Sequence, residues 1–252
     1  MRKVFRFSKN VGLQLIPGRS VKINTMISNV LFDLDGTLTD PKEGITRCIQ
    51  FAIDKLGREI PQADDLLWCI GPPLRDSFAR LLGSTDNALL DLALQHYRKR
   101  FTEIGIYENS IYPGIILALQ NIRASGYQMF LATSKPKVFA TRILDHFSLT
   151  PFFHGIFGSE IDGRLSDKGD LVGHILKYCA LDPRFSLIVG DRSHDVVGGK
   201  RNGIKTATVT YGYGTRCEID AAEPDFVFDS PSELAVFLQK NGPPNLPLNS
   251  DG

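Results

Sequence analysis

Four aspartates follow the ends of two short apolar runs in this sequence. Asp33 and Asp35 come directly after the apolar run 27–32, and Asp191 and Asp195 follow a second apolar run. Carboxylates gathered at one place repel one another and are costly to bury without a partner. A hard cation resolves this conflict, and Mg²⁺ typically takes one or two carboxylates together with phosphate oxygens and water. The four acids therefore predict a Mg²⁺ site.

Two further polar segments supply the groups that a phosphoryl-transfer site needs. Thr133 and Ser134 end a third apolar run, and Lys168 stands at the start of a segment with helical apolar spacing. A lysine there would hold a carboxylate nucleophile and phosphoryl oxygens as a point charge. Thr133 and the backbone near Ser134 can donate hydrogen bonds to the same oxygens. The favoured chemistry is attack of a carboxylate on phosphorus.

Each of these residues also has an ordinary structural interpretation. An acid after a strand often caps a helix or a turn, so Asp191 could cap a helix that begins at Ser193. Thr133 or Ser134 could likewise cap a helix, and a single lysine is most often exposed. The joint placement favours the functional interpretation, because ligands of an open parallel sheet bind at the carboxyl ends of its strands.

The elements that must position these residues alternate along the chain. Short apolar runs bounded by Gly, Asp or Pro suit buried parallel strands, and amphipathic segments between them suit helices. This alternation predicts a doubly wound, Rossmann-like α/β sheet. The predicted strands are 27–32, 127–132, 152–157, 186–189, 205–209 and 225–228, and the predicted helices are 114–125, 136–147, 168–180, 193–202 and 232–240.

Residues 41–112 interrupt the alternation. They contain no convincing strand, and glycines and a Gly-Pro-Pro turn divide them into four helical segments. We therefore predict an all-helical cap domain at 41–112, inserted into a core domain made of 27–40 and 113–240. The expected cap helices are 45–56, 63–70, 74–82 and 87–104.

The two ends of the chain differ from the rest. Residues 1–26 carry six basic and no acidic side chains, and we expect either a disordered extension or a start assigned too early, with Met26 as the true one. Residues 241–252 contain three prolines and are expected to be a disordered tail.

Composition narrows the class of protein. The 252 residues are 42% hydrophobic with a net charge of +1, which suits a globular chain and gives no reason to expect nucleic acid or an anionic membrane as a partner. No run reaches the length of a membrane span. The four cysteines are scattered, which suits free thiols in a reducing compartment, and we expect a cytoplasmic protein.

The motifs together resemble those of the haloacid dehalogenase-like hydrolase superfamily, within it the phosphoglycolate phosphatase-like group with an α-helical cap. The resemblance covers about residues 27–235 and rests on DLDGTLTD at 33–40, TSK at 133–135, Lys168 and GDRSHD at 190–195.

This resemblance implies a role for each acid. Asp33 would be phosphorylated and the aspartyl phosphate then hydrolysed. Asp35 would protonate the leaving group and afterwards activate water. Mg²⁺ would be held by Asp33, the backbone carbonyl of Asp35 and Asp191, while Asp195 would order a metal-bound water or Lys168.

Substrate selection is expected to come from the cap. Asp35 argues for phosphate rather than halide chemistry, because the dehalogenases of the superfamily lack an acid at that position. Arg75, just after the Gly-Pro-Pro turn, is the candidate for binding an anionic group of the substrate, with an exposed arginine as the alternative.

The resulting hypothesis is a Mg²⁺-dependent phosphatase for a small phosphorylated metabolite, either phosphoglycolate-like or a nucleotide. A phosphomutase of the same superfamily is the alternative, and a non-catalytic binding protein is a weaker one. A homodimer is left open.

Overall fold

The core of the protein is a seven-stranded sheet in which every pair of neighbours is parallel. The computed structural model describes residues 5–6 and 26–243. The strand order β1-β9-β8-β7-β2-β5-β6 places β2 and β7, which precede the four aspartates, side by side near the centre. The strands are β1 (Phe5–Arg6), β2 (Asn29–Phe32), β5 (Gln128–Pro136), β6 (Gly155–Ser159), β7 (Ser186–Gly190), β8 (Lys205–Val209) and β9 (Phe226–Phe228).

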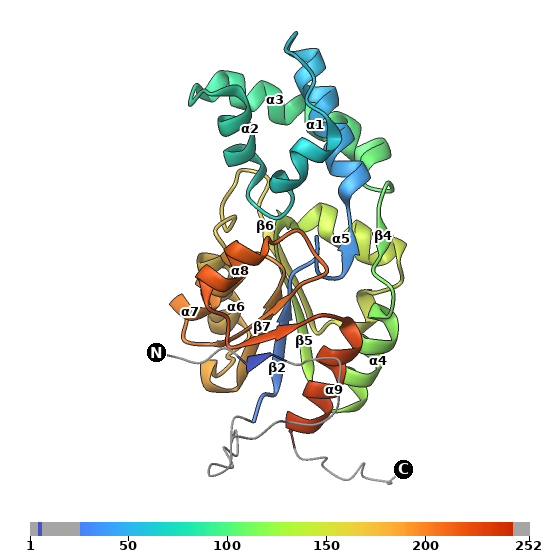
Figure 1. The fold of residues 1–252 in the computed structure, drawn as a ribbon, viewed down its shortest axis with the longest axis vertical. Helices are drawn as coiled ribbons and strands as arrows, with labels where there is room; N and C mark the ends of the chain where they lie inside the picture. Colours follow the sequence, from blue (N-terminus) through green and yellow to red (C-terminus); the bar gives the residue numbers. More distant parts are fainter. Residues whose placement is uncertain (1–4, 7–25, 244–252) are drawn as a thin grey trace.

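Helices cover both faces of the sheet, so the doubly wound fold predicted from the sequence is confirmed (Figure 1). One face carries α4 (Ile115–Ala124), α5 (Lys137–His146) and α9 (Pro231–Asn241), and the other carries α6 (Lys168–Tyr178) and α7 (Ser193–Arg201). The remaining core elements are α8 (Arg216–Ala222), η3 (Thr150–Phe152) and η4 (Pro183–Phe185).

Burial on both faces explains why the strands are continuous apolar runs. Successive side chains of a strand point to opposite faces. Val30 and Phe32 accordingly join the apolar cluster under α4, α5 and α9, whereas Leu31 between them joins the cluster under α6. All three side chains are almost completely inaccessible to solvent. A strand that alternated polar and apolar residues would instead bury polar side chains on one face of the sheet.

The six strands predicted from the sequence are all present; β8 has the predicted ends, and the other five are shifted by one or more residues. The largest shift is in β5, which continues past Thr133 to Pro136 with a register shift against β6 between these two residues. Besides the short 3₁₀ helices η3 and η4, two described core elements were not predicted. The two-residue strand β1 pairs with β9 at the edge of the sheet, and α8 is a short helix after the β8 strand.

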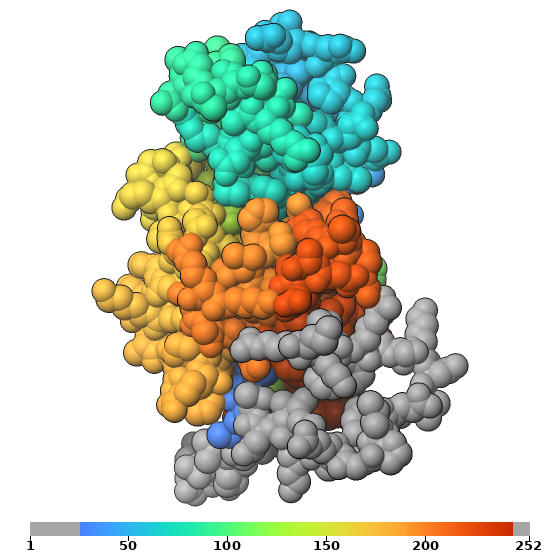
Figure 2. All heavy atoms as spheres, turned by 60° about the vertical axis from the view of Figure 1, so that its left-hand side comes forward, coloured from blue at the N-terminus to red at the C-terminus, as the bar shows by residue number. Residues whose placement is uncertain are grey.

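The cap is a separate cluster of helices on the carboxyl-end side of the sheet (Figures 1 and 2). Its predicted helices are present, although 63–70 forms a 3₁₀ helix and 87–104 ends in a turn of π-helix. The elements are α1 (Lys42–Lys55), η1 (Ala63–Cys69), α2 (Leu74–Leu82), α3 (Asn87–Arg100) and η2 (Phe101–Gly105).

The prediction that residues 41–112 contain no strand is wrong. Strand β3 (Thr39–Asp40) pairs antiparallel with β4 (Ser110–Ile111), so the two chain crossings between core and cap form a small two-stranded sheet. The backbone amide of Tyr112 also donates to the carbonyl of Leu38. Strands of two residues carry no periodic signal, and these form because the two crossings lie side by side.

The predicted extension at 1–26 lies outside the described residues except for β1 and Met26. The predicted tail at 241–252 is described only up to residue 243, and its first residue, Asn241, is the last residue of α9. Among the described helices, none combines the length and the apolar character that crossing a membrane requires.

Candidate active site

The turn after β2 presents two acids at the carboxyl edge of the sheet. The backbone amide of Asp33 donates to Val189 of β7, which keeps the residue in line with the sheet. The chain then turns at Gly36, whose φ of +80° favours glycine. The Asp33 and Asp35 side chains are both buried, and both line one cavity between core and cap.

Lys168 is buried behind Asp33. It is the first residue of α6, directly after Asp167, whose side chain caps the helix by accepting from the amide of Asp170. Its Nζ lies 2.9 Å from Oδ1 of Asp33 and 2.9 Å from Oδ1 of Asp195. Burial alone would lower the pKa of Lys168, but these two carboxylates raise it overall, so the ammonium group stays charged.

The third proton of that ammonium group is also used. The Nζ of Lys168 donates to the carbonyl oxygen of Ala132 in β5 at 2.8 Å. Three acceptors from three different segments therefore fix the amine. The exposed-lysine interpretation does not apply, because only 3% of this side chain is accessible.

Three carboxylates converge beside this lysine. Oxygen atoms of Asp33, Asp191 and Asp195 all lie within 4.8 Å of one another. Asp191 is fully inaccessible, and its Oδ2 accepts from the amide of Tyr213 at 2.7 Å. Its Oδ1 has no hydrogen-bond partner among the residues that the structure describes. Burial raises the pKa of Asp191, and the neighbouring Asp195 and Asp33 raise it further. Asp191 does not cap α7, whose N-cap is Arg192.

The charge and the donor set of this cluster fit Mg²⁺. Four buried carboxylates, those of Asp33, Asp35, Asp191 and Asp195, face two buried ammonium groups. When all four carboxylates are ionised, their charge exceeds that of the two ammonium groups by two, which equals the charge of one divalent cation. The unpartnered Oδ1 of Asp191 and the all-oxygen character of the cluster suit a hard metal ion.

Two glycines make room for this close packing. A Cβ atom at Gly36 or at Gly212 would overlap the carboxylate side chain of Asp191. At Gly36 a side chain would also be strained by the positive φ. The loop that carries Gly212 therefore lies directly against the turn after β2.

Asp35 has a partner that the sequence did not indicate. Its Oδ2 lies 2.8 Å from the Nζ of Lys135, and only 7% of that lysine side chain is accessible. The same Nζ lies 4.6 Å from the centre of the Phe101 ring, which belongs to the cap. Burial raises the pKa of Asp35, although Lys135 opposes this effect. The one feature of the sequence that could have pointed to Lys135 as a site residue is its position directly after Thr133-Ser134.

Thr133 and Ser134 lie at the irregular end of β5. The Thr133 hydroxyl accepts from the amide of Lys135 at 3.3 Å, and the Ser134 carbonyl accepts from the hydroxyl of Ser159 in β6. Neither caps α5, whose N-cap is Pro136 without a side-chain hydrogen bond. A bulge at this point turns the two residues toward the cavity instead of continuing the pleat.

The cavity has a volume of about 800 Å³ and lies between core and cap. Its core side carries Asp33, Asp35, Thr133 and Ser134, whereas Asp191, Asp195 and Lys168 lie outside its lining. Its cap side includes Arg75, together with Tyr97 and Phe101 among other residues. Five of the predicted site residues therefore line one cavity, and the other three lie behind Asp33.

Arg75 is not a free cation. One guanidinium nitrogen lies 2.6 Å from Oδ1 of Asp91, and another donates to the side-chain oxygen of Asn87 at 2.8 Å. Two other arginines of the lining also have partners, because Arg98 donates to the carbonyl of Ile161 and Arg164 pairs with Asp162. Anionic groups of a substrate would have to compete with these contacts.

Comparisons with known proteins place this geometry in a family. Residues 30–209 match the family model described as haloacid dehalogenase-like hydrolase. A 5'-nucleotidase from Pseudomonas aeruginosa is 44% identical over 196 residues, which is 78% of this chain and 88% of that protein. The tyrosine-protein kinase PtkA from Mycobacterium tuberculosis is 36% identical over 204 residues, which is 81% of this chain and 67% of that protein.

A solved structure supports the same relation. The crystal structure of a predicted phosphatase from Clostridium acetobutylicum has a TM-score of 0.82 and 35% sequence identity, and the match covers 85% of this chain and 99% of that one. The relatives also include a phosphoglycolate phosphatase from Aquifex aeolicus. The family model alone spans both sheet-edge motifs and the cap between them, and so the chain belongs to the haloacid dehalogenase-like hydrolase family.

Proposed function

We propose that this protein is a Mg²⁺-dependent phosphatase that hydrolyses a small phosphomonoester through an aspartyl-phosphate intermediate. One observation carries the proposal. Asp33 and Asp35 reach one cavity side by side, while Lys168, Asp191 and Asp195 gather behind Asp33 with uncompensated negative charge. This arrangement suits a carboxylate nucleophile beside a second carboxyl group that can exchange a proton with the leaving group.

In the first half-reaction, Asp33 would form a bond to phosphorus while the bond from phosphorus to the alcohol oxygen breaks. Asp35 would give its proton to that oxygen. Burial raises the pKa of Asp35, which favours the acid form that this step needs, although the neighbouring Lys135 opposes the effect. In the second half-reaction, Asp35 would take a proton from water as the water attacks phosphorus. The bond to Asp33 then breaks and inorganic phosphate leaves.

The other residues would position these two acids. Lys168 fixes Asp33 and contributes positive charge near the phosphoryl group. Thr133 and Ser134 would donate hydrogen bonds to phosphoryl oxygens. Mg²⁺, held by Asp33, Asp191 and the backbone carbonyl of Asp35 with Asp195 nearby, would screen the repulsion between a carboxylate and a phosphate dianion.

We favour nucleoside monophosphates as the substrate class. The 44% identical relative is named a 5'-nucleotidase. A cavity of about 800 Å³ with Tyr97 and Phe101 on its cap side has room for a group larger than a two-carbon acid. Phosphoglycolate would need a cation for its carboxylate, and Arg75, the predicted residue, is already paired with Asp91.

The test is release of inorganic phosphate from a panel of phosphorylated compounds with Mg²⁺. We expect nucleoside monophosphates to be hydrolysed with higher kcat/KM than phosphoglycolate, pyrophosphate or sugar phosphates. The Asp33→Asn variant should fold and lose at least about 1,000-fold in kcat, as expected when a nucleophile is removed. Undiminished turnover by this variant would contradict the mechanism. Dependence of turnover on an added acceptor sugar would instead favour the phosphomutase alternative.

A further inference from the structure

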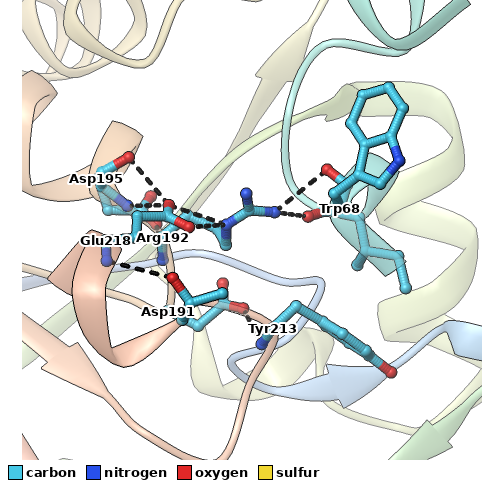
Figure 3. A network of polar contacts seen from close by, with 9 residues as sticks. Trp68, Asp191, Arg192, Asp195, Tyr213 and Glu218 are labelled. Atoms are coloured by element: carbon cyan, nitrogen blue, oxygen red, sulfur yellow. Dashed lines mark hydrogen bonds and ion pairs between the residues drawn. The ribbon is translucent and has the colours of Figure 1, made fainter. Parts of the chain in front are cut away.

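Arg192 reaches from the core into the cap. It stands between Asp191 and Asp195 in the loop after β7, and only 10% of its side chain is accessible. One of its guanidinium nitrogens donates to the carbonyl oxygens of Ile70 and Trp68 in the cap, the latter at 3.5 Å (Figure 3). The contact joins two segments more than 120 positions apart in the chain.

Its cap partners are groups that need a donor. Trp68 is close to the last residue of η1, and Ile70 is the residue that follows this helix. Carbonyl groups at the C-terminal end of a helix lack partners within the helix and carry partial negative charge. A guanidinium group satisfies such carbonyls without requiring a particular side chain on the cap.

The other side of the guanidinium is held by the core. The Nε of Arg192 lies 3.0 Å from Oε1 of Glu218 in α8. The same carboxylate accepts from the amide and the hydroxyl of Ser193 at 2.8 and 2.9 Å. The core therefore fixes the orientation of this arginine independently of the cap. Helix α8 supplies the carboxylate that does so, a role that the sequence did not suggest.

Arg192 also lies between two carboxylates of the cluster, Asp191 in the same loop and Asp195 in the first turn of α7. The amide of Arg192 donates to Oδ2 of Asp195 at 3.3 Å, and Asp191 is the preceding residue (Figure 3). Arg192 thus contacts Asp195 of the cluster with its backbone and the cap with its side chain.

The cap segment that follows is shaped around this arginine. Gly71 has a φ of +105°, and a Cβ atom there would lie 2.8 Å from Cγ of Arg192. Two prolines then lead directly into α2, where Arg75 lines the cavity. Because prolines restrict the backbone, fixing Ile70 and Gly71 also fixes the start of α2.

We propose that Arg192, oriented by Glu218, is a positioning residue that latches the cap to the core and sets where the segment Gly71–Arg75 lies over the phosphate site. The effect of this latch on turnover rests on the phosphatase function proposed above. The latch itself is a property of the contacts between cap and core, and it can be measured without turnover.

The experiment compares Arg192→Met with a matched arginine of α8. Arg216 is half-exposed, and among the described residues its ion pair is with Asp220 of the same helix. Amide hydrogen exchange of the full chain is followed with Mg²⁺ and inorganic phosphate present. In Arg192→Met we expect exchange in residues 63–71 to rise between about tenfold and 100-fold, the range for losing a hydrogen bond to a charged group. Arg216→Met should exchange as the wild type does.

Kinetics on the substrate found in the phosphate-release panel give the second measurement. We expect kcat/KM of Arg192→Met to fall by a similar factor while its affinity for Mg²⁺ stays at the wild-type value. Arg192→Lys, which keeps the charge but loses the planar donors, should recover part of the loss. Glu218→Gln should retain the hydrogen bonds from Ser193 and show a smaller rise in exchange at residues 63–71. This variant replaces Arg192→Met in the test if Arg192→Met does not fold.

Three results would overturn the latch. The first is unchanged exchange at residues 63–71 in both Arg192→Met and Glu218→Gln. The second is faster exchange that extends equally through β2 and β7, which would indicate a general loss of stability. The third is a loss of Mg²⁺ affinity as large as the loss of kcat/KM. If the wild type hydrolyses no phosphomonoester, the proposed function fails, whereas exchange at 63–71 still decides the latch.

Discussion

Replacing Asp191 by Asn should stabilise the metal-free protein and abolish its response to Mg²⁺. Asp191 is fully inaccessible, one of its oxygens has no hydrogen-bond partner, and oxygens of two other carboxylates lie within 4.8 Å. Asparagine has nearly the same shape and can still accept from the amide of Tyr213. The substitution therefore removes a buried charge and leaves the packing in place.

The size of the effect follows from the distances. The carboxylate oxygens lie within 4.8 Å of one another, and a like charge at that outer limit repels by about 3.5 kcal/mol at an effective dielectric constant of 20. Asp33 and Asp195 each exert this repulsion, and the positive charge of Lys168 beside them offsets about one of the two. Allowing for a weaker hydrogen bond from Tyr213, we expect a gain of between about 1 and 3 kcal/mol in the free energy of unfolding.

Mg²⁺ should reverse the order of stability. A ligand at 100 times its dissociation constant stabilises the folded state by about 2.7 kcal/mol, and we expect the wild type to gain this and Asp191→Asn to gain little. The assay is chemical denaturation in EDTA and in excess Mg²⁺, supported by melting temperatures, where 1 kcal/mol corresponds to about 2 to 4 °C for a chain of this size.

Asp65→Asn is the control, because Asp65 is an exposed acid of the cap. Its change in stability should stay within about 0.5 kcal/mol under both conditions. The reasoning is refuted if Asp191→Asn is less stable than the wild type in EDTA, or if it keeps the stabilisation by Mg²⁺ that the wild type shows.

Three further predictions concern the same cluster. Because burial raises the pKa of Asp191 above its unfolded value, its contribution to stability is present at low pH and is lost as pH rises. As pH rises above the ordinary range of an aspartate, the metal-free protein should therefore lose stability and its stabilisation by Mg²⁺ should grow, as denaturation at several pH values would reveal. Gly36→Ala should cost more than the roughly 1 kcal/mol expected for Gly57→Ala, since both have positive φ but only the first would overlap Asp191; equal losses in denaturation would contradict this. Lys135→Met leaves a buried carboxylate unpaired and should destabilise by about 3 to 5 kcal/mol and lower kcat, whereas the exposed Lys137→Met should do neither.

The sheet and the cluster at its edge were predictable because local signals agree with the tertiary structure. Runs such as 27–32 and 186–189 are apolar on both faces and end abruptly in acids, which identifies both the buried strand and its carboxyl end. Parallel neighbours then bring Asp33 and Asp191 together without any further information. The roles proposed for these residues remain predictions.

The parts that were missed depend on contacts between distant segments. Nothing near Lys135 in the sequence indicates that Asp35 and Phe101 surround it, because Phe101 comes from the cap. In the cap, Arg192 binds backbone carbonyls, which every residue possesses, so these partners leave no trace in residue types. The strands β3 and β4 are too short to show a period and exist only as a pair.

The pairing of β3 with β4 has a consequence for how the chain folds. The central strands β2 and β5 pair through Asn29 and Gln128, which are 99 positions apart, so their pairing closes a long loop. Once Asp40 pairs with Ser110, the cap no longer adds to the length of this loop. About 30 positions then remain in the loop that β2 and β5 close. Loop-closure entropy grows with the logarithm of loop length, so this shortcut lowers the entropic barrier by about 1 kcal/mol. The helical insertion, rich in local contacts, can therefore form early and bring together the two halves of the core that it separates.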